Sequence, residues 1–544
     1  MKSSDISEEM IKEFKDRVLN DMLVIQYQAL FNSLSFIKEI NIKVLQLIKC
    51  RLHLQLDLNN ESIVDLTIKS CELKTVEGLQ LPNLEILNLS NNKLTSIKNI
   101  KNFTKLKVLN LSHNHKVKIH HLQFLVQLKE LDLSECMLTN IYAVQSLVNL
   151  EVLDISKNRS INISKLENIT SLKLLCANHC RIKDISKLRS LINLEVLDLA
   201  HNNISDIWAI QYQVNLTILD LDYNCIKDIS KLSSLINLEM LYLAHNNISD
   251  IQAIQHLVKL TSLDLDHNSI KDISPLQYQQ NLQELIILNH DRTEVSVAPL
   301  KSLSQLKKLI INNCIIQDIS HLNTLINLEE FRIEFSLNLN LSMMQFWVNL
   351  KKLTIVYSVV QNISVLKNLI YLEELNCSYN ANIDITPLQY LVNLKILKIC
   401  YCQLKSITQL RPLINLQELH LPSNYICDIS PLEPLVKLQY LGIYDNFITD
   451  FTPIQQHPNY KMYFISEQNI PTIQEQIIST KIQIVEGINL KHINLNRKMK
   501  ILNLDFTLAV QRANSLIKQQ YYDLIAFTGK IVQLFGSLNS SHYE

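Results

Sequence analysis

The stretch LEVLDLAHNNISDI, residues 194–207, decides the fold because it returns in altered form at a fixed spacing, with first leucines at positions 172, 194, 216 and 238. A near copy, LEMLYLAHNNISDI, occupies residues 238–251, two periods further along the chain. Such a unit supplies one short strand and one tight turn, and it buries too little apolar surface to be stable alone. Stacked copies bury a continuous core. The sequence therefore predicts a solenoid whose function belongs to a long surface rather than to a pocket.

Each repeat separates into positions that build the core and positions that face outward. Its leucines are expected to point inward from a short parallel strand, and its isoleucines to fill the core behind the turn. The asparagine should turn the chain, because its amide can satisfy backbone groups that the corner leaves unpaired. The expected core set of the quoted repeat is Leu194, Leu197, Leu199, Asn202, Ile204 and Ile207. Prolines at the start of the return arm predict a short helical turn there, at Pro275, Pro387, Pro431 and Pro453.

The repeats continue over most of the chain. First leucines recur with a 22-residue period from position 84 to 282 and, after one 24-residue step, from 306 to 438, which gives 17 regular repeats. The pattern LxxLxLxxNxIxDIxxLxxL resembles the leucine-rich repeat, in the subclass shared by the leucine-rich regulatory subunit of protein phosphatase 1 and the bacterial internalins. The resemblance implies a curved α/β solenoid with a parallel sheet on its concave side, usually a surface for binding proteins.

Three parts are expected along the chain. Residues 1–41 are predicted to form an N-terminal helical cap, residues 42–474 a solenoid of about 20 repeats, and residues 475–544 a mainly helical segment. The N-terminal helix is inferred from an apolar stripe at Ile6, Met10, Phe14, Val18 and Met22. It could instead bind a partner. A second amphipathic helix is predicted at 505–536, where it would cap the last repeat, mediate self-association, or attach to a membrane surface.

Composition limits the classes of partner. The 544 residues carry a formal net charge of zero, so there is no global electrostatic reason to expect nucleic acid or an anionic membrane as partner. The acidic N-terminal stretch and the lack of a run of 18 apolar residues predict no membrane insertion and a cytoplasmic location, with the nucleus left open. Six cysteines take the place of the turn asparagine and are expected to be buried thiols: Cys50, Cys71, Cys136, Cys180, Cys314 and Cys402.

Catalytic signatures are missing from the sequence. The five glycines are too scattered to form GxGxxG or GxxxxGK[ST], so no nucleotide cofactor is predicted. Some bacterial proteins with a similar array carry a ubiquitin ligase domain with a catalytic cysteine after it, but here no cysteine follows Cys427. The sequence therefore predicts a protein that is not an enzyme.

Candidate binding residues lie at the outward positions of the strand and turn. Side chains alternate across a strand, so residues between the inward leucines should face the solvent on the concave side. Carboxylates occupy this row and the position after the third leucine, at Asp132, Asp154, Asp198, Asp220, Asp222, Asp264 and Asp266. The next position changes from histidine to aromatic residues, and the candidates there are His201, His245, His267, Phe335, Tyr357, Tyr379 and Tyr401, with Tyr444 nearby.

We interpret these rows as a surface for a protein ligand. The carboxylates would receive Lys or Arg, and the aromatic residues would supply anchors. Alternatively, Asp is ordinary at this strand position and the tyrosines stack for stability. A metal site formed by His201, Asp198 and Asp220, or by His267, Asp264 and Asp266, has only the stacking register in its favour, so no metal is predicted.

The functional prediction is a non-catalytic protein-interaction scaffold or regulatory subunit. Two alternatives stay open: a structural component of a cytoskeletal or ciliary assembly, and a protein phosphatase targeting subunit. The second is favoured only by the resemblance.

Overall fold

The computed structural model describes residues 8–26, 34–50, 57–288, 294–312, 314–316, 319–336, 339–455 and 462–464. The chain divides into two compact units, Met1–Ser336 and Leu337–Glu544. Both units repeat one design: a strand, a tight turn, a short 3₁₀ helix and a return to the next strand. Consecutive strands pair in parallel, one repeat apart.

The strands of the first unit form one long parallel sheet, with two small additional pairs, β3 with β5 and β16 with β18. The strands are β1 Met22–Gln26, β2 Val44–Ile48, β3 Leu58–Asn59, β4 Asp65–Lys69, β5 Leu79–Gln80, β6 Ile86–Asn88, β7 Val108–Asn110, β8 Glu130–Asp132, β9 Val152–Asp154, β10 Leu174–Cys176, β11 Val196–Asp198, β12 Ile218–Asp220, β13 Met240–Tyr242, β14 Ser262–Asp264, β15 Glu284–Leu288, β16 Glu294–Val295, β17 Lys308–Asn312, β18 Ile315–Ile316 and β19 Glu330–Glu334.

The second unit continues the same pattern. Its parallel strands are β20 Lys352–Val356, β21 Glu374–Asn376, β22 Ile396–Lys398, β23 Glu418–His420, β24 Tyr440–Gly442 and β25 Met462–Phe464.

Short helices form the return arms. In the first unit they follow helix α1 Glu8–Asp16 and are η1 Ser35–Glu39, η2 Lys98–Asn102, η3 His120–Phe124, η4 Tyr142–Ser146, η5 Ser164–Asn168, η6 Ser186–Ser190, η7 Trp208–Tyr212, η8 Ser230–Ser234, η9 Gln252–His256, η10 Ser274–Tyr278, η11 Ala298–Ser302 and η12 Ile319–Thr324. In the second unit they are η13 Leu341–Phe346, η14 Ser364–Asn368, η15 Thr386–Tyr390, η16 Thr408–Leu410, η17 Ser430–Leu432 and α2 Thr452–Gln455.

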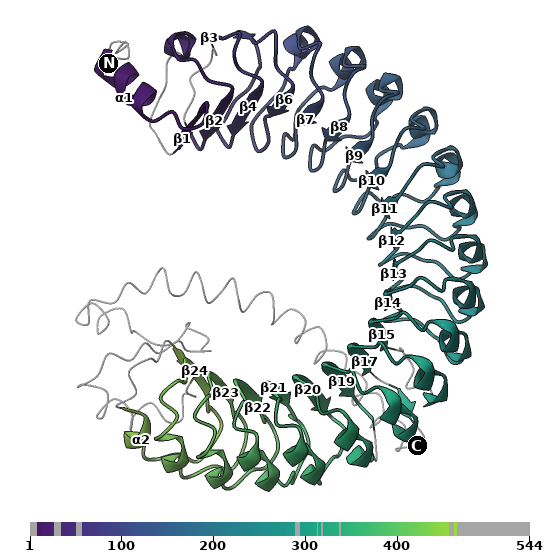
Figure 1. Cartoon of the computed structure of the whole chain (residues 1–544), viewed down its shortest axis with the longest axis vertical. Coiled ribbons are helices and arrows are strands. Elements are labelled where there is room, and N and C mark those ends of the chain that lie inside the picture. Colours follow the sequence, from purple (N-terminus) through teal and green to yellow (C-terminus); the bar gives the residue numbers. More distant parts are fainter. Residues whose placement is uncertain are drawn as a thin grey trace, which may run out of the picture. The chain divides into compact units, whose positions relative to one another are not determined.

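The core lies between the sheet and the 3₁₀ helices. In each unit the strands line the inner, concave side and the helices the outer side (Figure 1). The predicted inward residues of the quoted repeat are confirmed, since Leu194, Leu197 and Leu199 are fully buried. Burying each such leucine contributes roughly 1.5–3 kcal/mol relative to leaving it exposed. The predicted prolines also stand where expected, for example Pro275 at the start of η10. The curved leucine-rich repeat solenoid is therefore the observed fold.

A ladder of buried asparagines fixes the corner of each repeat. The Asn202 Oδ1 accepts hydrogen bonds from the backbone N–H groups of Cys180 and Ile182, at 3.1 and 2.8 Å. Its Nδ2 donates to the carbonyl oxygens of Ala177 and Leu199, both at 2.9 Å. One side chain thus satisfies four backbone groups from two repeats. The predicted role of the asparagine is confirmed.

Cysteine fills the same position in other repeats with fewer hydrogen bonds. The six predicted cysteines are all buried, and the Sγ of Cys180 donates to the carbonyl oxygen of Ile155 at 3.2 Å. Burial raises the pKa of this thiol to about 11, which keeps its proton in place as a donor. In several repeats where Cys or Ser replaces the asparagine, the next residue also adopts a left-handed backbone: Glu72, Met137, Arg181, Val359 and Gln403 have φ between 52° and 60°.

The aspartate of the quoted motif has a local role that the repeat pattern alone did not reveal. Asp206 Oδ1 accepts a hydrogen bond from the backbone N–H of Trp208 at 2.9 Å, which begins η7. Asp184 and Asp228 do the same for the helices on either side. These bonds lower the pKa of Asp184 and of Asp228, because they stabilise the charged form. The Asp-Ile dipeptide therefore starts the return helix.

The N-terminal prediction needs a correction. Helix α1 ends at Asp16, whereas the apolar stripe had extended the helix to Met22. The chain instead reverses at Asn20 and Asp21, which have φ of 51° and 61°, and Met22 begins a strand that pairs with β2. Asn and Asp tolerate this backbone conformation, so Asn20-Asp21 forms a turn and the helix does not continue along the apolar stripe to Met22. The sheet thus begins before residue 42.

The C-terminal predictions lie mostly outside the described residues. Strand β25 pairs with β24 and includes Tyr463, which places a further strand after the last regular repeat and within the solenoid predicted for residues 42–474. The helix predicted at 505–536 and the boundary at 475 fall among residues that the structure does not describe. Within the part of the chain that is described, no helix is long and apolar enough to cross a membrane.

Candidate protein-binding face

The predicted acidic residues follow the ends of consecutive strands in the first unit. Asp132 pairs directly with Asp154, and Asp198 with Asp220. Cys176 separates these two pairs, and Tyr242 stands between Asp220 and Asp264. The stripe is therefore two pairs and a single residue rather than an unbroken row.

These carboxylates also have a structural task. Each strand aspartate accepts a hydrogen bond from the backbone N–H two residues later, as Asp198 Oδ1 does from Ala200 at 3.0 Å. The same bond is made at Asp132, Asp154, Asp220 and Asp264. In addition, the second oxygen of Asp198 accepts a hydrogen bond from the side chain of Asn178. The aspartates thus end the strands as well as presenting charge.

Burial changes the acidity of several members of the stripe. The side chains are half-buried, whereas the sequence had predicted that they face solvent. Burial raises the pKa of Asp220 and of Asp264 to about 6, with the charges of Asp198 and Asp266 adding smaller effects. It raises the pKa of Asp222 to about 7, with the neighbouring charge of Asp220 as the next cause. These carboxylates therefore titrate close to neutral pH.

The residue before each ladder asparagine, or before the Cys or Ser that replaces it, forms a second row, which we call the turn row. Its backbone is left-handed in the ring-bearing repeats described below, for example φ 54° at His201 and 55° at Tyr401. Non-glycine residues rarely adopt this conformation, and His, Asn and Asp are enriched among those that do. The conformation aligns the side chains of successive repeats, so that each can contact the next.

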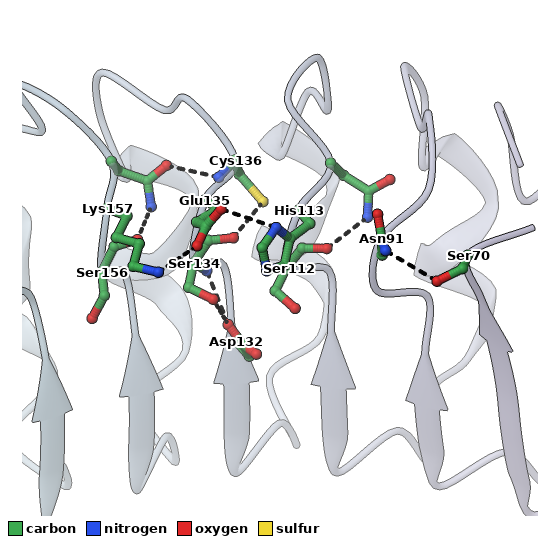
Figure 2. Close-up of polar contacts among 12 residues, drawn as sticks. Ser70, Asn91, Ser112, His113, Asp132, Ser134, Glu135, Cys136, Ser156 and Lys157 are labelled. Atoms are coloured by element: carbon green, nitrogen blue, oxygen red, sulfur yellow. Dashed lines mark hydrogen bonds and ion pairs between the residues drawn. The ribbon is translucent and has the colours of Figure 1, made fainter. Parts of the chain in front are cut away.

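In the early repeats the polar side chains of the turn row contact one another. His113 Nδ1 lies 3.0 Å from Glu135 Oε2, and Lys157 Nζ lies 2.6 Å from the other oxygen of the same carboxylate (Figure 2). One repeat earlier, the amide of Asn91 donates to Ser70 Oγ at 3.0 Å. The hydrogen bond from Lys157 is the main cause that lowers the pKa of Glu135. This part of the row is neutralised by its own neighbours.

Further along the first unit the turn row becomes a stack of rings. His179, His201, Tyr223, His245 and His267 lie face to face, with ring centroids 3.9–4.1 Å apart. Tyr223 was missing from the predicted row, although its position, one period after His201, marks it as a member. Burial, and then the neighbouring His179, lower the pKa of His201. We call residues 176–268, which hold this stack and the carboxylates beside it, the histidine–aspartate segment.

One cluster in this segment brings together potential metal ligands. Ligand atoms of His245, Asp266 and His267 lie within 4.8 Å of one another. Asp266 Oδ2 is 2.9 Å from His267 Nδ1. The sequence analysis considered a trio of His267, Asp264 and Asp266. The structure brings His267 and Asp266 together, but the third member is His245 rather than Asp264.

The second unit carries a tyrosine stack on the same row. The ring centroids of Tyr357 and Tyr379 are 4.0 Å apart, and those of Tyr379 and Tyr401 are 4.6 Å apart. Tyr357 and Tyr379 are half-buried and Tyr401 is 46% exposed. Burial is the main cause that raises the pKa of Tyr379, so its hydroxyl stays protonated at any physiological pH. We call residues 352–402 the tyrosine segment.

Two further predicted aromatic candidates lie outside residues 352–402. Phe335 occupies the turn row after β19 in the first unit, with φ 57° and a half-buried side chain. In the last repeat the turn-row residue is Asp445, with φ 53°, and the half-buried Tyr444 precedes it. Of the predicted aromatic set, the tyrosine stack thus unites three members, Tyr357, Tyr379 and Tyr401.

A shallow hollow of about 470 Å³ in the second unit is lined by Lys, Glu and amide side chains together with Tyr371. Its charged groups are already engaged, because Lys395 Nζ lies 2.8 Å from Glu373 Oε2 and Lys437 Nζ donates to Asn415 Oδ1 at 2.6 Å. The turn row, not this hollow, carries the distinctive chemistry.

Comparison with known proteins finds families with the same kind of repeat. A family model described as leucine rich repeat matches residues 214–270, and one described as two copies of leucine rich repeats matches residues 82–123 and 170–209. No curated protein sequence matches the chain significantly.

Several solved structures are similar. A leucine-rich repeat protein of Leptospira interrogans is 20% identical with a TM-score of 0.56, and the match covers 74% of this chain and 95% of that one. The leucine-rich repeat ectodomain of a plant membrane receptor kinase from Arabidopsis thaliana, solved with Casparian strip integrity factor 2, is 20% identical with a TM-score of 0.58, covering 86% of this chain and 61% of that one. At this identity the two structures support the fold alone.

A third structure shows a closer sequence relationship. An internalin from Listeria monocytogenes is 31% identical with a TM-score of 0.51, and the match covers 55% of this chain and 88% of the internalin. Together with the repeat pattern and the observed solenoid, this likeness shows that the chain belongs to the leucine-rich repeat proteins.

Proposed function

We propose that this protein is a non-catalytic scaffold that binds a protein ligand on its concave sheet and turn row. The observation that carries the proposal is the tyrosine stack of Tyr357, Tyr379 and Tyr401. Three aligned aromatic rings on a rigid solenoid offer a large contact area with little loss of side-chain freedom, which is typical of binding hot spots.

The chemistry of the two segments indicates what kind of ligand fits. The tyrosine segment would accept apolar or aromatic side chains, with the tyrosine hydroxyls as hydrogen-bonding groups. The carboxylates of the first unit, including Asp132, Asp154, Asp198 and Asp264, would receive Lys or Arg side chains. A protein or peptide offers both kinds of group in one chain, whereas the phosphates of nucleic acid would be repelled by these carboxylates.

Similar proteins lend general support. The Arabidopsis receptor ectodomain was solved in complex with a named factor, and its fold is the same. The stacked tyrosines could instead serve stability alone, so the two roles must be separated by experiment.

The test is affinity purification of the full chain followed by mass spectrometry, with the wild type beside a variant carrying Tyr357→Ala, Tyr379→Ala and Tyr401→Ala. We expect the main partner to be lost, with affinity falling by at least about tenfold, since one hot-spot residue is worth about 2 kcal/mol or more. The matched control replaces three exposed tyrosines outside the row, Tyr371, Tyr390 and Tyr425, with alanine. Partners retained by a folded turn-row variant would refute the proposal.

The identity of the partner also separates the remaining alternatives. A phosphatase catalytic subunit would select the targeting role, and tubulin-associated proteins would select a cytoskeletal or ciliary role. Self-association through residues 505–536 would appear as recovery of an untagged second copy of the chain.

A further inference from the structure

A group of side chains in the histidine–aspartate segment has the composition of a metal site. His245 and His267 belong to the turn row of successive repeats, and Asp266 precedes His267 at the strand end. One ligand atom from each lies within 4.8 Å of the other two. Two imidazoles and a carboxylate are the ligand types that bind Zn²⁺ and similar first-row ions.

The carboxylate of Asp266 has a place left for a cation. Its Oδ2 pairs with His267 Nδ1 at 2.9 Å, but its Oδ1 is buried and has no hydrogen-bond partner among the described residues. A buried carboxylate oxygen without a partner is costly, and buried polar atoms are nearly always satisfied. The equivalent oxygen of Asp222, two repeats earlier, accepts a hydrogen bond from the backbone N–H of Ala244 at 2.6 Å. Asp266 Oδ1 thus lacks the backbone hydrogen bond that the carboxylate of Asp222 makes.

The surroundings of Asp266 also favour a cation. In other repeats the position of Asp266 often holds a small residue, such as Ala200 or Ala244. The charge of Asp266 acts on both Asp222 and Asp264, so three carboxylates share one region of the sheet end. The positive charge of Lys308 acts in the opposite direction on the pKa of Asp264, but it is the smallest of the causes that shift this pKa. A divalent ion would relieve the mutual repulsion of these carboxylates.

We propose that His245, Asp266 and His267 bind a single divalent first-row transition ion such as Zn²⁺. The rings now lie face to face, with centroids 3.9 Å apart and planes 16° apart. A tetrahedral ion with bonds of about 2.0–2.1 Å needs ligand atoms about 3.3 Å apart, so the imidazoles must turn about their Cβ–Cγ bonds and draw together. Both rings are only half-buried, which leaves room for that rotation, and water would complete the coordination.

The chain contains a natural counterpart of this site. Residues 181–224 and 225–268 resemble each other closely, and the counterpart of His245, Asp266 and His267 in the first block is His201, Asp222 and Tyr223. Tyr223 cannot supply an imidazole. It occupies the turn with φ 54°, close to the 51° of His267, so either side chain fits either turn.

The test compares Zn²⁺ binding by the full chain and its variants, measured by calorimetric titration with ZnCl₂ and by the absorption spectrum of bound Co²⁺. The decisive variant is His267→Tyr, which copies the first block. We expect it to lose one equivalent of ion, with affinity at least about tenfold weaker, since loss of a supporting residue alone typically costs about 10–100-fold. Binding unchanged in both stoichiometry and affinity would overturn the proposal.

Two further variants make the result specific. His179→Tyr removes a stacked histidine outside the cluster, 4.0 Å from His201, and should bind as the wild type does. Loss of the same equivalent in this variant would show a general property of the row and overturn the three-residue site. Tyr223→His should gain a second, weaker equivalent, because one oxygen of Asp222 is already engaged by Ala244. His267→Ala gives an independent removal, and circular dichroism checks the fold of each variant.

Discussion

The histidine–aspartate segment and the tyrosine segment share one backbone design but present different chemistry. Both rest on buried leucines and a ladder asparagine, Asn202 in one and Asn380 in the other. On the turn row, the first carries imidazoles beside carboxylates such as Asp222, whose pKa is raised to about 7, and the second carries stacked phenols, of which Tyr379 has a raised pKa and stays protonated. The comparison teaches that the core positions of the repeat stay constant while its outward positions change.

The largest effect should come from breaking the part that the two segments share. Asn202→Ala and Asn380→Ala should each lower the free energy of unfolding by about 3 kcal/mol or more, because an unpaired buried polar group costs about 1–3 kcal/mol. Each asparagine accepts from two backbone N–H groups and donates to three carbonyl oxygens. Urea denaturation measures the loss. The neighbouring exposed Asn203→Ala is the control, and a comparable loss there would contradict the ladder's role.

The next effect should distinguish the segments by pH. Binding of a lysine-rich peptide to the histidine–aspartate segment should weaken by about tenfold between pH 8 and pH 5.5, because binding requires ionised carboxylates and a group with a pKa near 7 must lose its proton first. The carboxyl of Asp222 has its pKa raised to about 7. Fluorescence anisotropy measures this affinity. Binding of an aromatic peptide to the tyrosine segment should not change over this range, and equal pH dependence in both would undo the distinction.

A smaller effect concerns stability alone. An acid whose pKa is higher in the folded than in the unfolded chain holds more protons when folded, so stability falls as pH rises between the two values. For Asp222 that window runs from 3.8 to about 7. Asp222→Asn should therefore remove a decline on the order of 1 kcal/mol across this range, after allowance for partial exposure. Thermal melts from pH 4 to pH 8 measure the slope. The control is Asp184→Asn, because the carboxyl of Asp184 has a lowered pKa in the wild type. This variant should not flatten the fall in stability between pH 4 and pH 8.

The smallest effect concerns a residue type that differs between the segments: the left-handed position after the replaced asparagine holds Arg181 in one and the β-branched Val359 in the other. In the tyrosine segment Ser358 replaces the ladder asparagine, and the exposed Val359 that follows has φ 52°. A β-branched residue is strained there, whereas Asn adopts this conformation readily. Val359→Asn should raise the free energy of unfolding by about 1 kcal/mol, measured by urea denaturation. Val392→Asn, also exposed, should give no gain, and a destabilised Val359 variant would contradict the strain.

Much of the fold could be predicted because it is periodic. Leucine spacing placed the strands, asparagine placed the corners and proline placed the return helices, since each residue type fits one position of the repeat. The error at Met22 arose where periodicity was absent and a two-residue turn signal, Asn20-Asp21, competed with a helical stripe. The spacing of apolar residues also did not predict that Asp206 starts the return helix through its hydrogen bond with the backbone N–H of Trp208.

The candidate site could be predicted only as rows of residues. Spacing identified most turn-row members, but burial of Asp220, Asp222 and Asp264 depends on neighbouring repeats, and their raised pKa values depend on that burial. The approach of His245 to Asp266 and His267 likewise depends on the left-handed turn that aligns these side chains.

By itself, the sequence determined that the chain is a leucine-rich solenoid, because a short unit that repeats with fixed apolar positions can bury its core only by stacking. Tertiary structure alone decided which outward side chains touch, how far they are removed from water and which polar atoms lack a partner. The physical reason is that contact and desolvation are properties of neighbouring repeats in space. A pattern along the chain names the members of a row but not the distances between them.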